Sequence, residues 1–166
     1  YLMPHLIMPS YDNTLLAQTC KAAVLRQVEY GEQRNVPWGI SESCYNTTDS
    51  QQIYQYRAFG VPGLGFKRGL GDDLVIAPYA SALALTVMPQ LACNNLQTLA
   101  AIGMLGTYGF YEAADYTPSR VPRGKSSVTV RTFMAHHQGM SLLAFEQTLL
   151  NSPMQRRFMS DPLIQA

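Results

Sequence analysis

Apolar residues recur at helical spacing along several stretches of the chain. The first stretch predicts an amphipathic helix of about 17 residues, capped by Asp12 or Asn13 and ended or loosened at Gly31. The second begins at Pro78, a residue suited to a first helical turn, and runs through Met88. It is apolar on every side, which is typical of a helix that is buried all round.

Two further stretches have the same period. One follows Pro89 and ends by Gly106, and the other runs from Phe133 to about Asn151. A short final helix is expected to begin at Pro153. These patterns predict a domain in which helices carry most of the mass.

Strand-like alternation is confined to short segments. It appears over Ile53–Val61 and over Ser126–Thr132. The glycine-rich segment Gly60–Gly71 superficially resembles a phosphate-binding loop but lacks its Gly-Lys-Ser/Thr ending, so a compact loop is favoured. Asp72 and Asp73 are expected to cap the following helix or to interact with its dipole at the N-terminus, rather than to act as catalysts.

The composition favours a surface that binds neutral polar ligands. Charged residues make up 14% of the chain, whereas a typical soluble protein has about 25%. Gly, Pro, Ser, Thr, Asn, Gln and Tyr replace them, and hydroxyls, amides and aromatic faces are the groups that bind sugars. The alternative is a piece of a larger protein whose other parts cover these faces.

Charge and cysteine usage exclude several classes of function. The net charge is +1 and no cluster of Lys and Arg is present, so the sequence does not predict a basic surface that would bind nucleic acid. No transmembrane segment and no signal peptide are expected, because no apolar run approaches about 18 residues and the N-terminus lacks a basic-then-apolar layout. Cys20, Cys44 and Cys93 are odd in number and widely spaced, which argues against zinc and disulfides and fits a reducing compartment.

Two glutamates lie in unusual company. Glu42 lies in Val36–Asn46 and Glu112 in Tyr108–Thr117, each among aromatic and small polar residues with no Lys or Arg within four positions. A carboxylate beside apolar rings is disfavoured in its charged form, which suits it to act as a general acid. Glycoside cleavage needs two such carboxyls. The alternative is that each merely accepts backbone N–H bonds in its turn.

Other chemistries have weaker support. Competing carboxylates lie in loops (Asp49, Asp72, Asp73, Asp115). His136 and His137 are adjacent, which is not the spacing of two metal ligands on one helix face, so no metal site is expected. His137 shares an apolar stripe and is expected in the core, whereas His136 and Gln138 are free to reach a ligand. No Gly-x-Ser-x-Gly elbow is present to support a serine-hydrolase triad.

Several long motifs together resemble one known family. They are, in order, Val36–Asn46, Tyr56–Gly63, Lys67–Ser81, Tyr108–Ala113 and Met134–Met140. They resemble the glucoamylase-like domain of bacterial cyclic β-1,2-glucan synthases, which is related to endo-β-1,2-glucanases. The likeness runs from about Pro9 to Asn151, and the conserved order of five motifs makes it specific.

This resemblance implies an all-α fold, an (α/α)6 toroid with short strands in its loops. Residues 1–166 would be a partial glucoamylase-like domain, the C-terminal half of the toroid. The implied partners are the other half and the neighbouring synthase domains, a membrane-embedded glycosyltransferase and a phosphorylase-like domain. The implied location is the cytoplasmic portion of a bacterial inner-membrane protein.

The resemblance also implies a reaction and its residues. Glu42 would be the nucleophile and Glu112 the acid/base of a retaining transglycosylase that cyclises linear β-1,2-glucan without a cofactor. The substrate-binding residues would be Trp38, Ser41, Tyr45, Asn46, Arg57, Tyr111, Arg120, His136 and Gln138. The alternatives are an inverting endo-β-1,2-glucanase, whose carboxyls would lie about 6.5–9.5 Å apart rather than about 5–5.5 Å, and a non-catalytic glucan-binding or structural fragment.

Overall fold

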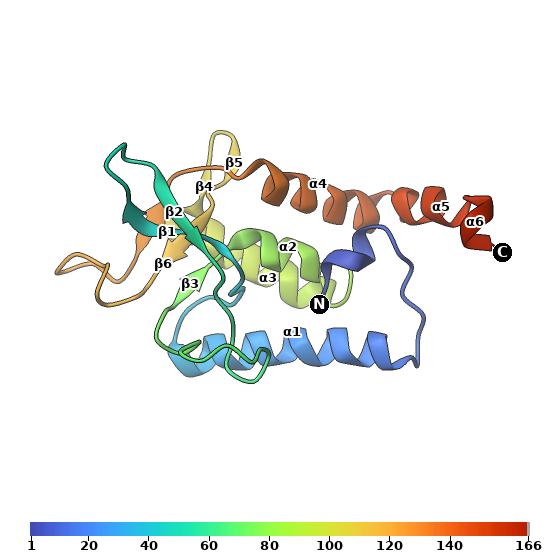
Figure 1. Cartoon of the computed structure of the whole chain (residues 1–166), viewed down its shortest axis with the longest axis horizontal. Coiled ribbons are helices and arrows are strands. Elements are labelled where there is room, and N and C mark those ends of the chain that lie inside the picture. Colours follow the sequence, from blue (N-terminus) through green and yellow to red (C-terminus); the bar gives the residue numbers. More distant parts are fainter. Residues whose placement is uncertain (166) are drawn as a thin grey trace.

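Helices with short strands between them make up the chain, as the sequence predicts (Figure 1). The structure is a computed structural model that describes residues 1–165. The α-helices are α1 (Leu15–Arg34), α2 (Pro78–Ala84), α3 (Pro89–Leu99), α4 (Ala135–Leu149), α5 (Pro153–Met159) and α6 (Pro162–Gln165). A 3₁₀ turn, η1 (Met3–Leu6), precedes α1, and a π-helical turn, η2 (Ala100–Met104), follows α3.

Helix α1 begins later and ends later than predicted, and its 20 residues exceed the expected length. Its N-cap is Thr14, whose hydroxyl accepts a hydrogen bond from the Ala17 N–H, and not Asp12 or Asn13. The helix continues through Gly31 to Arg34 and ends at Asn35 in a left-handed conformation (φ +53°). The expectation that Gly31 ends or loosens the helix is therefore wrong.

Gly31 serves close packing instead. A Cβ built on it would lie 3.0 Å from Trp38 Cβ and 3.0 Å from the Val36 carbonyl oxygen. The chain leaves α1 and folds directly back over this position, so the backbone approach needs a residue without a side chain.

Gly31→Ala is therefore expected to destabilise the fold by about 1–3 kcal/mol, the usual cost of overpacking. Gly139→Ala in α4 is the matched control, because a Cβ there meets nothing within 4 Å. It is expected to be neutral or to stabilise by up to about 1 kcal/mol, since alanine has the higher helix propensity. Urea unfolding of the variants measures both values. Equal midpoints for Gly31→Ala and wild type would refute the close-packing role.

Helices α2 and α3 are shorter than predicted. Helix α2 is buried all round, as expected, but ends at Ala84, and Met88 has φ −138° and ψ +71° before the next helix begins. A residue before proline is disfavoured in the α conformation, which accounts for the break before Pro89. Helix α3 passes into η2, where Gly103 has φ +87°.

The strands form small antiparallel sheets. One pairs β1 (Ser43–Thr48) with β2 (Tyr54–Arg57), the second orders β3 (Val75–Ile76), β6 (Ala113–Asp115) and β7 (Val128–Val130), and the third pairs β4 (Leu105–Gly106) with β5 (Gly109–Phe110). Strands β2 and β7 lie inside the predicted segments but are shorter. Glu42 directly precedes β1 and Glu112 directly precedes β6, so both glutamates lie where a loop enters a strand.

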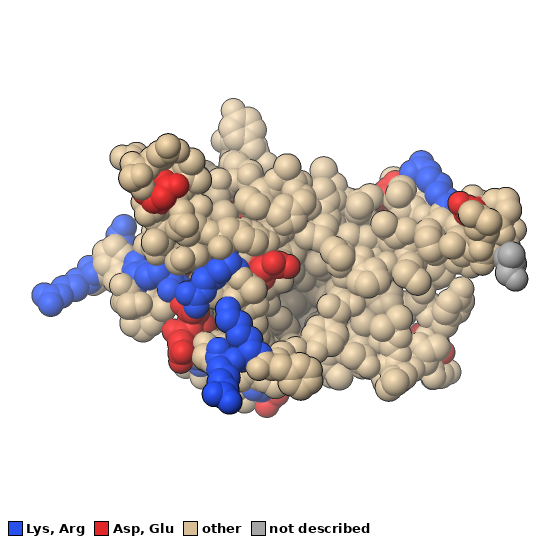
Figure 2. Space-filling view, in the orientation of Figure 1, with Lys and Arg blue, Asp and Glu red and all other residues tan. Residues whose placement is uncertain are grey.

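The helices form one end of the molecule and the strands the other. Helix α2 packs against α3 and α4, and α1 runs along the opposite side from α4 (Figure 1). The main core joins Val24 and Tyr30 of α1 to Ile76 of β3 and Leu99 of α3. Lys and Arg gather over the strands and loops on the face in Figure 2, and much of the surface over the helices is uncharged. Within residues 1–165, no helix has the length and apolarity needed to cross a membrane.

Candidate active site

Glu42 is held by its backbone and leaves its side chain exposed. The Tyr79 hydroxyl, from α2, donates to Ser41 Oγ at 2.7 Å and lies 3.0 Å from the Glu42 carbonyl oxygen. Gln27 of α1 pairs with both backbone groups of Ile40, at 2.9 and 2.7 Å. Two helices therefore fix the loop that presents the carboxylate.

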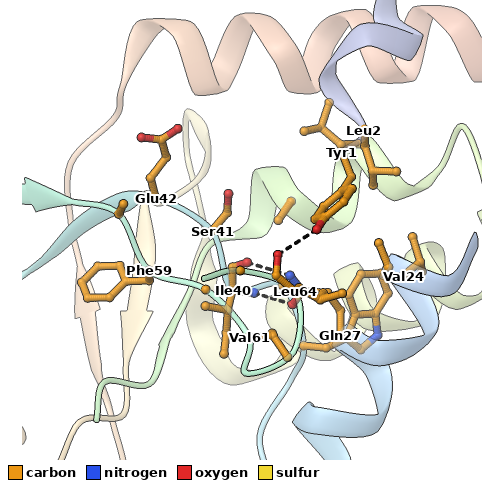
Figure 3. Close-up of a pocket in the computed structure, with 18 of the residues that line it drawn as sticks. Tyr1, Leu2, Val24, Gln27, Ile40, Ser41, Glu42, Phe59, Val61 and Leu64 are labelled. Atoms are coloured by element: carbon orange, nitrogen blue, oxygen red, sulfur yellow. Dashed lines mark hydrogen bonds between the residues drawn. The ribbon is translucent and has the colours of Figure 1, made fainter. Parts of the chain in front are cut away.

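Glu42 lies at the edge of a pocket of about 470 Å³, called here the Glu42 pocket. Its walls are mostly apolar, with Val24, Ile40 and Val61 among them. The Tyr1 hydroxyl donates to the Leu64 carbonyl across one wall. In Figure 3 the Glu42 carboxylate points away from these apolar residues, so it borders the pocket without entering its apolar interior.

Glu112 has the opposite environment, with only 2% of its surface exposed. Its Oε1 accepts a hydrogen bond from the Cys44 N–H at 3.2 Å and lies 2.8 Å from His137 Nδ1. Its Oε2 is buried and has no hydrogen-bond partner within residues 1–165. The residue lines a second pocket, of about 520 Å³, called here the Glu112 pocket. The backbone N–H on Glu112 comes from β1, 68 positions away, and not from the turn that contains Glu112. His137 adds a titratable partner.

His137 is buried, as its apolar stripe predicts, and it also contacts the candidate site. Its ring stacks on Tyr79 with 3.8 Å between centroids and a 13° interplanar angle. Its Nε2 lies 3.5 Å from the Tyr56 hydroxyl. The sequence interpretation missed these contacts because helical periodicity reports burial and not the partner of a buried polar group.

The tyrosines that contact His137 have raised pKa values. Burial raises the pKa of Tyr56 to about 12, and the charges of Glu42 and Glu112 and a hydrogen bond with Glu42 add to the rise. Burial likewise raises the pKa of Tyr79 far above its usual value. Burial raises the pKa of the Cys44 thiol to about 11, with a further contribution from Glu112. All of these groups stay protonated at neutral pH.

Arg57 and Arg120, predicted to bind substrate, form ion pairs within the protein. Arg120 contacts Asp73 at 2.6 Å and the fully buried Asp115 at 2.7 Å, and Arg57 also pairs with Asp73. The interpretation of Asp73 as a helix-dipole residue is therefore wrong. Helix α2 starts after Ala77 with no side-chain cap, and Asp73 bridges two arginines instead.

The other predicted sugar-binding residues fall into separate places. Trp38 is buried in the main core, where it lines the Glu42 pocket with Ser41. Tyr45 and Asn46 lie on β1 beside Arg120, with the Tyr45 ring 4.9 Å from the guanidinium carbon and the Asn46 amide donating to the Arg120 carbonyl.

Tyr111 and Gln138 line the Glu112 pocket, where Gln138 donates to the Phe110 carbonyl. His136 is exposed, with its ring centroid 4.0 Å from that of His137. Among residues 1–165, no three His, Cys, Asp or Glu side chains are grouped as a metal site would require.

The chain is a helix-rich scaffold that presents two glutamates beside pockets with aromatic residues in their walls. Residues 1–162 match the Glycoamylase family model, described as "Putative glucoamylase". The chain belongs to this glucoamylase-like family. It is 46% identical over all 166 residues to the cyclic β-(1,2)-glucan synthase NdvB of Rhizobium meliloti (strain 1021), of which it covers 6%.

Solved structures share the fold. The β-1,2-glucanase of Parabacteroides distasonis matches 98% of this chain with a TM-score of 0.64 and 19% identity, and the chain covers 21% of that protein. The endo-β-1,2-glucanase of Chitinophaga pinensis, solved with sophorotriose and glucose, matches 90% with a TM-score of 0.58 and 19% identity, and the chain covers 32% of it. The chain thus spans less than a third of the length of each of these relatives.

Proposed function

We propose that this chain carries the catalytic glutamates of a retaining transglycosylase that cyclises linear β-1,2-glucan. The observation that carries the proposal is that Tyr56 and His137 lie between Glu112 and Glu42, each of which directly precedes a strand. The extensive identity to a cyclic β-(1,2)-glucan synthase supports the substrate and the outcome. In this proposal Tyr111, His136 and Gln138 would contact the sugar near Glu112.

The proposal includes a larger domain. Residues 1–166 would form the C-terminal half of an (α/α)6 toroid, and the other half would supply the remaining wall of the cleft. Exposed apolar side chains on α1 (Leu15, 85%) and α4 (Leu142, 67%; Leu149, 77%) fit such a neighbour. The parent protein would be a bacterial inner-membrane synthase with this domain in its cytoplasmic portion, beside the other synthase domains.

The roles of the two glutamates are open to two assignments. The family resemblance makes Glu42 the nucleophile and Glu112 the acid/base. The geometry of Glu112 favours the reverse, because the Cys44 N–H and His137 complement a negative charge on Oε1. Glu42, exposed at the rim of its pocket, would then exchange protons with the sugar.

Inverting hydrolysis is the second candidate. Glu42 and Glu112 line different pockets, with Tyr79 bordering both, and this separation suits a water molecule between carboxyl and sugar. The structural likeness to endo-β-1,2-glucanases supports the same alternative.

The deciding experiment incubates the complete domain with linear β-1,2-glucan and measures product masses. Cyclisation gives rings that lack one water relative to the linear chain of the same length. Linear products alone, with inverted configuration by NMR, would establish the hydrolase instead. Binding without turnover would reduce the domain to a glucan-binding module.

A further inference from the structure

Tyr56 and His137 form a series of polar groups that runs from Glu112 toward Glu42. Glu112 Oε1 lies 2.8 Å from His137 Nδ1, and His137 Nε2 lies 3.5 Å from the Tyr56 hydroxyl. The Glu42 carboxylate lies close enough to the same hydroxyl to contribute to its raised pKa. Hydrogen bonds of a catalytic site are often long in the absence of substrate and tighten when it binds. Each inner member of the series both donates and accepts a proton.

The series connects the interior with the surface. Glu112 and His137 are 2% and 1% exposed, whereas Tyr56 is 40% exposed and the neighbouring Glu42 is exposed too. The Tyr79 ring covers one face of His137, and β2 holds Tyr56 opposite Cys44 of β1. Bulk water is thereby kept from Glu112 Oε1, and His137 is its titratable neighbour.

Building on the proposed function, we infer that Tyr56 and His137 form a proton relay that couples the protonation of Glu42 to that of Glu112. Neither residue is assigned a catalytic or substrate-binding role above. Both are positioning and relay residues for the two carboxyls.

The relay has two directions. In one, the Glu112 carboxyl donates to His137 Nδ1, His137 Nε2–H donates to Tyr56, and Tyr56 O–H donates to the Glu42 carboxylate. Reversal moves one proton across each of the three contacts. The net result is transfer of one proton from Glu112 to Glu42, with Tyr56 and His137 left neutral.

Each direction leaves one carboxyl ionised and the other protonated. A retaining glycosidase mechanism requires this combination before the glycosidic bond breaks. The relay thus works with either assignment of nucleophile and acid. The raised pKa of Tyr56 fits the role, since a relay phenol must not lose its proton to solvent.

Tyr56→Phe in the complete domain tests the relay with two substrates. Turnover of linear β-1,2-glucan is expected to fall about 10²-fold or more, because the sugar leaving group needs a proton. Turnover of a 2,4-dinitrophenyl β-glycoside of a β-1,2-gluco-oligosaccharide, whose leaving group needs none, is expected to stay within about threefold of wild type. Tyr54→Phe on the same strand is the control and is expected to leave both rates unchanged.

Two kinetic outcomes would overturn the relay. One is unchanged glucan turnover in Tyr56→Phe, and the other is an equal loss on both substrates, which would indicate a merely structural role. A wild-type domain that is inactive on glucan would instead contradict the proposed function.

A measurement without turnover tests the relay separately. In the domain labelled with ¹⁵N-histidine, Tyr56→Phe and Glu42→Gln are each expected to shift the His137 Nε2 resonance, because each changes the far end of the series. Tyr54→Phe is expected to leave it in place. A His137 resonance that is unmoved by Glu42→Gln would refute the coupling, whatever the activity of the domain.

Discussion

Glu42→Gln and Glu112→Gln are each expected to reduce turnover of linear β-1,2-glucan by about 10²–10⁴-fold in the complete domain, the range found for loss of a positioned acid or base. A glutamine keeps the shape of the side chain but neither ionises nor exchanges a proton. The rate of ring formation measures the effect. Glu29→Gln on α1, where the carboxylate is 58% exposed and pairs with Arg26, is the control and is expected to keep wild-type turnover.

Wild-type turnover in either site variant would remove that residue from the catalytic pair. Circular dichroism must show an intact fold, above all for Glu112→Gln, because Glu112 is buried against His137. The amide still accepts the Cys44 N–H through its oxygen, so the substitution is expected to fold.

Azide rescue assigns the two roles. In a retaining enzyme, the alanine variant of the nucleophile yields a glycosyl azide of inverted configuration, and that of the acid/base yields one of retained configuration. An inverted azide from Glu112→Ala would establish the assignment that the two donors on Glu112 favour. The same product from Glu42→Ala would establish the assignment from the family resemblance.

Arg120→Met is expected to lower the free energy of unfolding by about 3–5 kcal/mol, the usual cost of removing one partner from a buried ion pair. The Arg120 side chain is 14% exposed, and it faces Asp115 at 0% and Asp73 at 10%. Methionine fills similar volume but leaves both carboxylates without that cation. Urea unfolding measures the loss.

Arg157→Met in α5 is the control for this prediction. Arg157 lies 4.0 Å from Glu146 and its side chain is 69% exposed, so its loss is expected to change stability by less than about 1 kcal/mol. Wild-type stability in Arg120→Met together with a raised KM for glucan would return Arg120 to the substrate-binding residues that the sequence predicted.

The fold was predictable where the signal is local. The buried character of α2 follows from its all-apolar composition, and the break before Pro89 follows from the steric restriction on Met88. The prediction for Gly31 was wrong because a glycine is needed there for a tertiary contact and not to end the helix. The chain that packs on it returns from Val36 to Trp38, and no helix propensity encodes that approach.

The candidate site was predictable in its two carboxylates and in several pocket-lining residues, but not in the contacts between them. Glu42 and Glu112 stand out because no basic residue is near them in sequence. Their surroundings come from long-range contacts, with His137 lying 25 positions from Glu112 and Tyr56 lying 81 positions from His137. Asp73 likewise meets Arg120 across 47 positions. Local pattern carries no information on such pairings.

Tyr79 contacts both the loop that presents Glu42 and the histidine that pairs with Glu112. From the largely buried helix α2 it contacts Ser41 Oγ and the Glu42 carbonyl with its hydroxyl and the His137 ring with its face. A loop residue ordinarily fluctuates independently of a side chain on another helix. Here the Glu42 loop and the His137 ring both contact the same residue, Tyr79. Thermal motion of the Glu42 loop and of His137 should therefore be correlated, and the spacing of the pair should change little with temperature until α2 itself loosens.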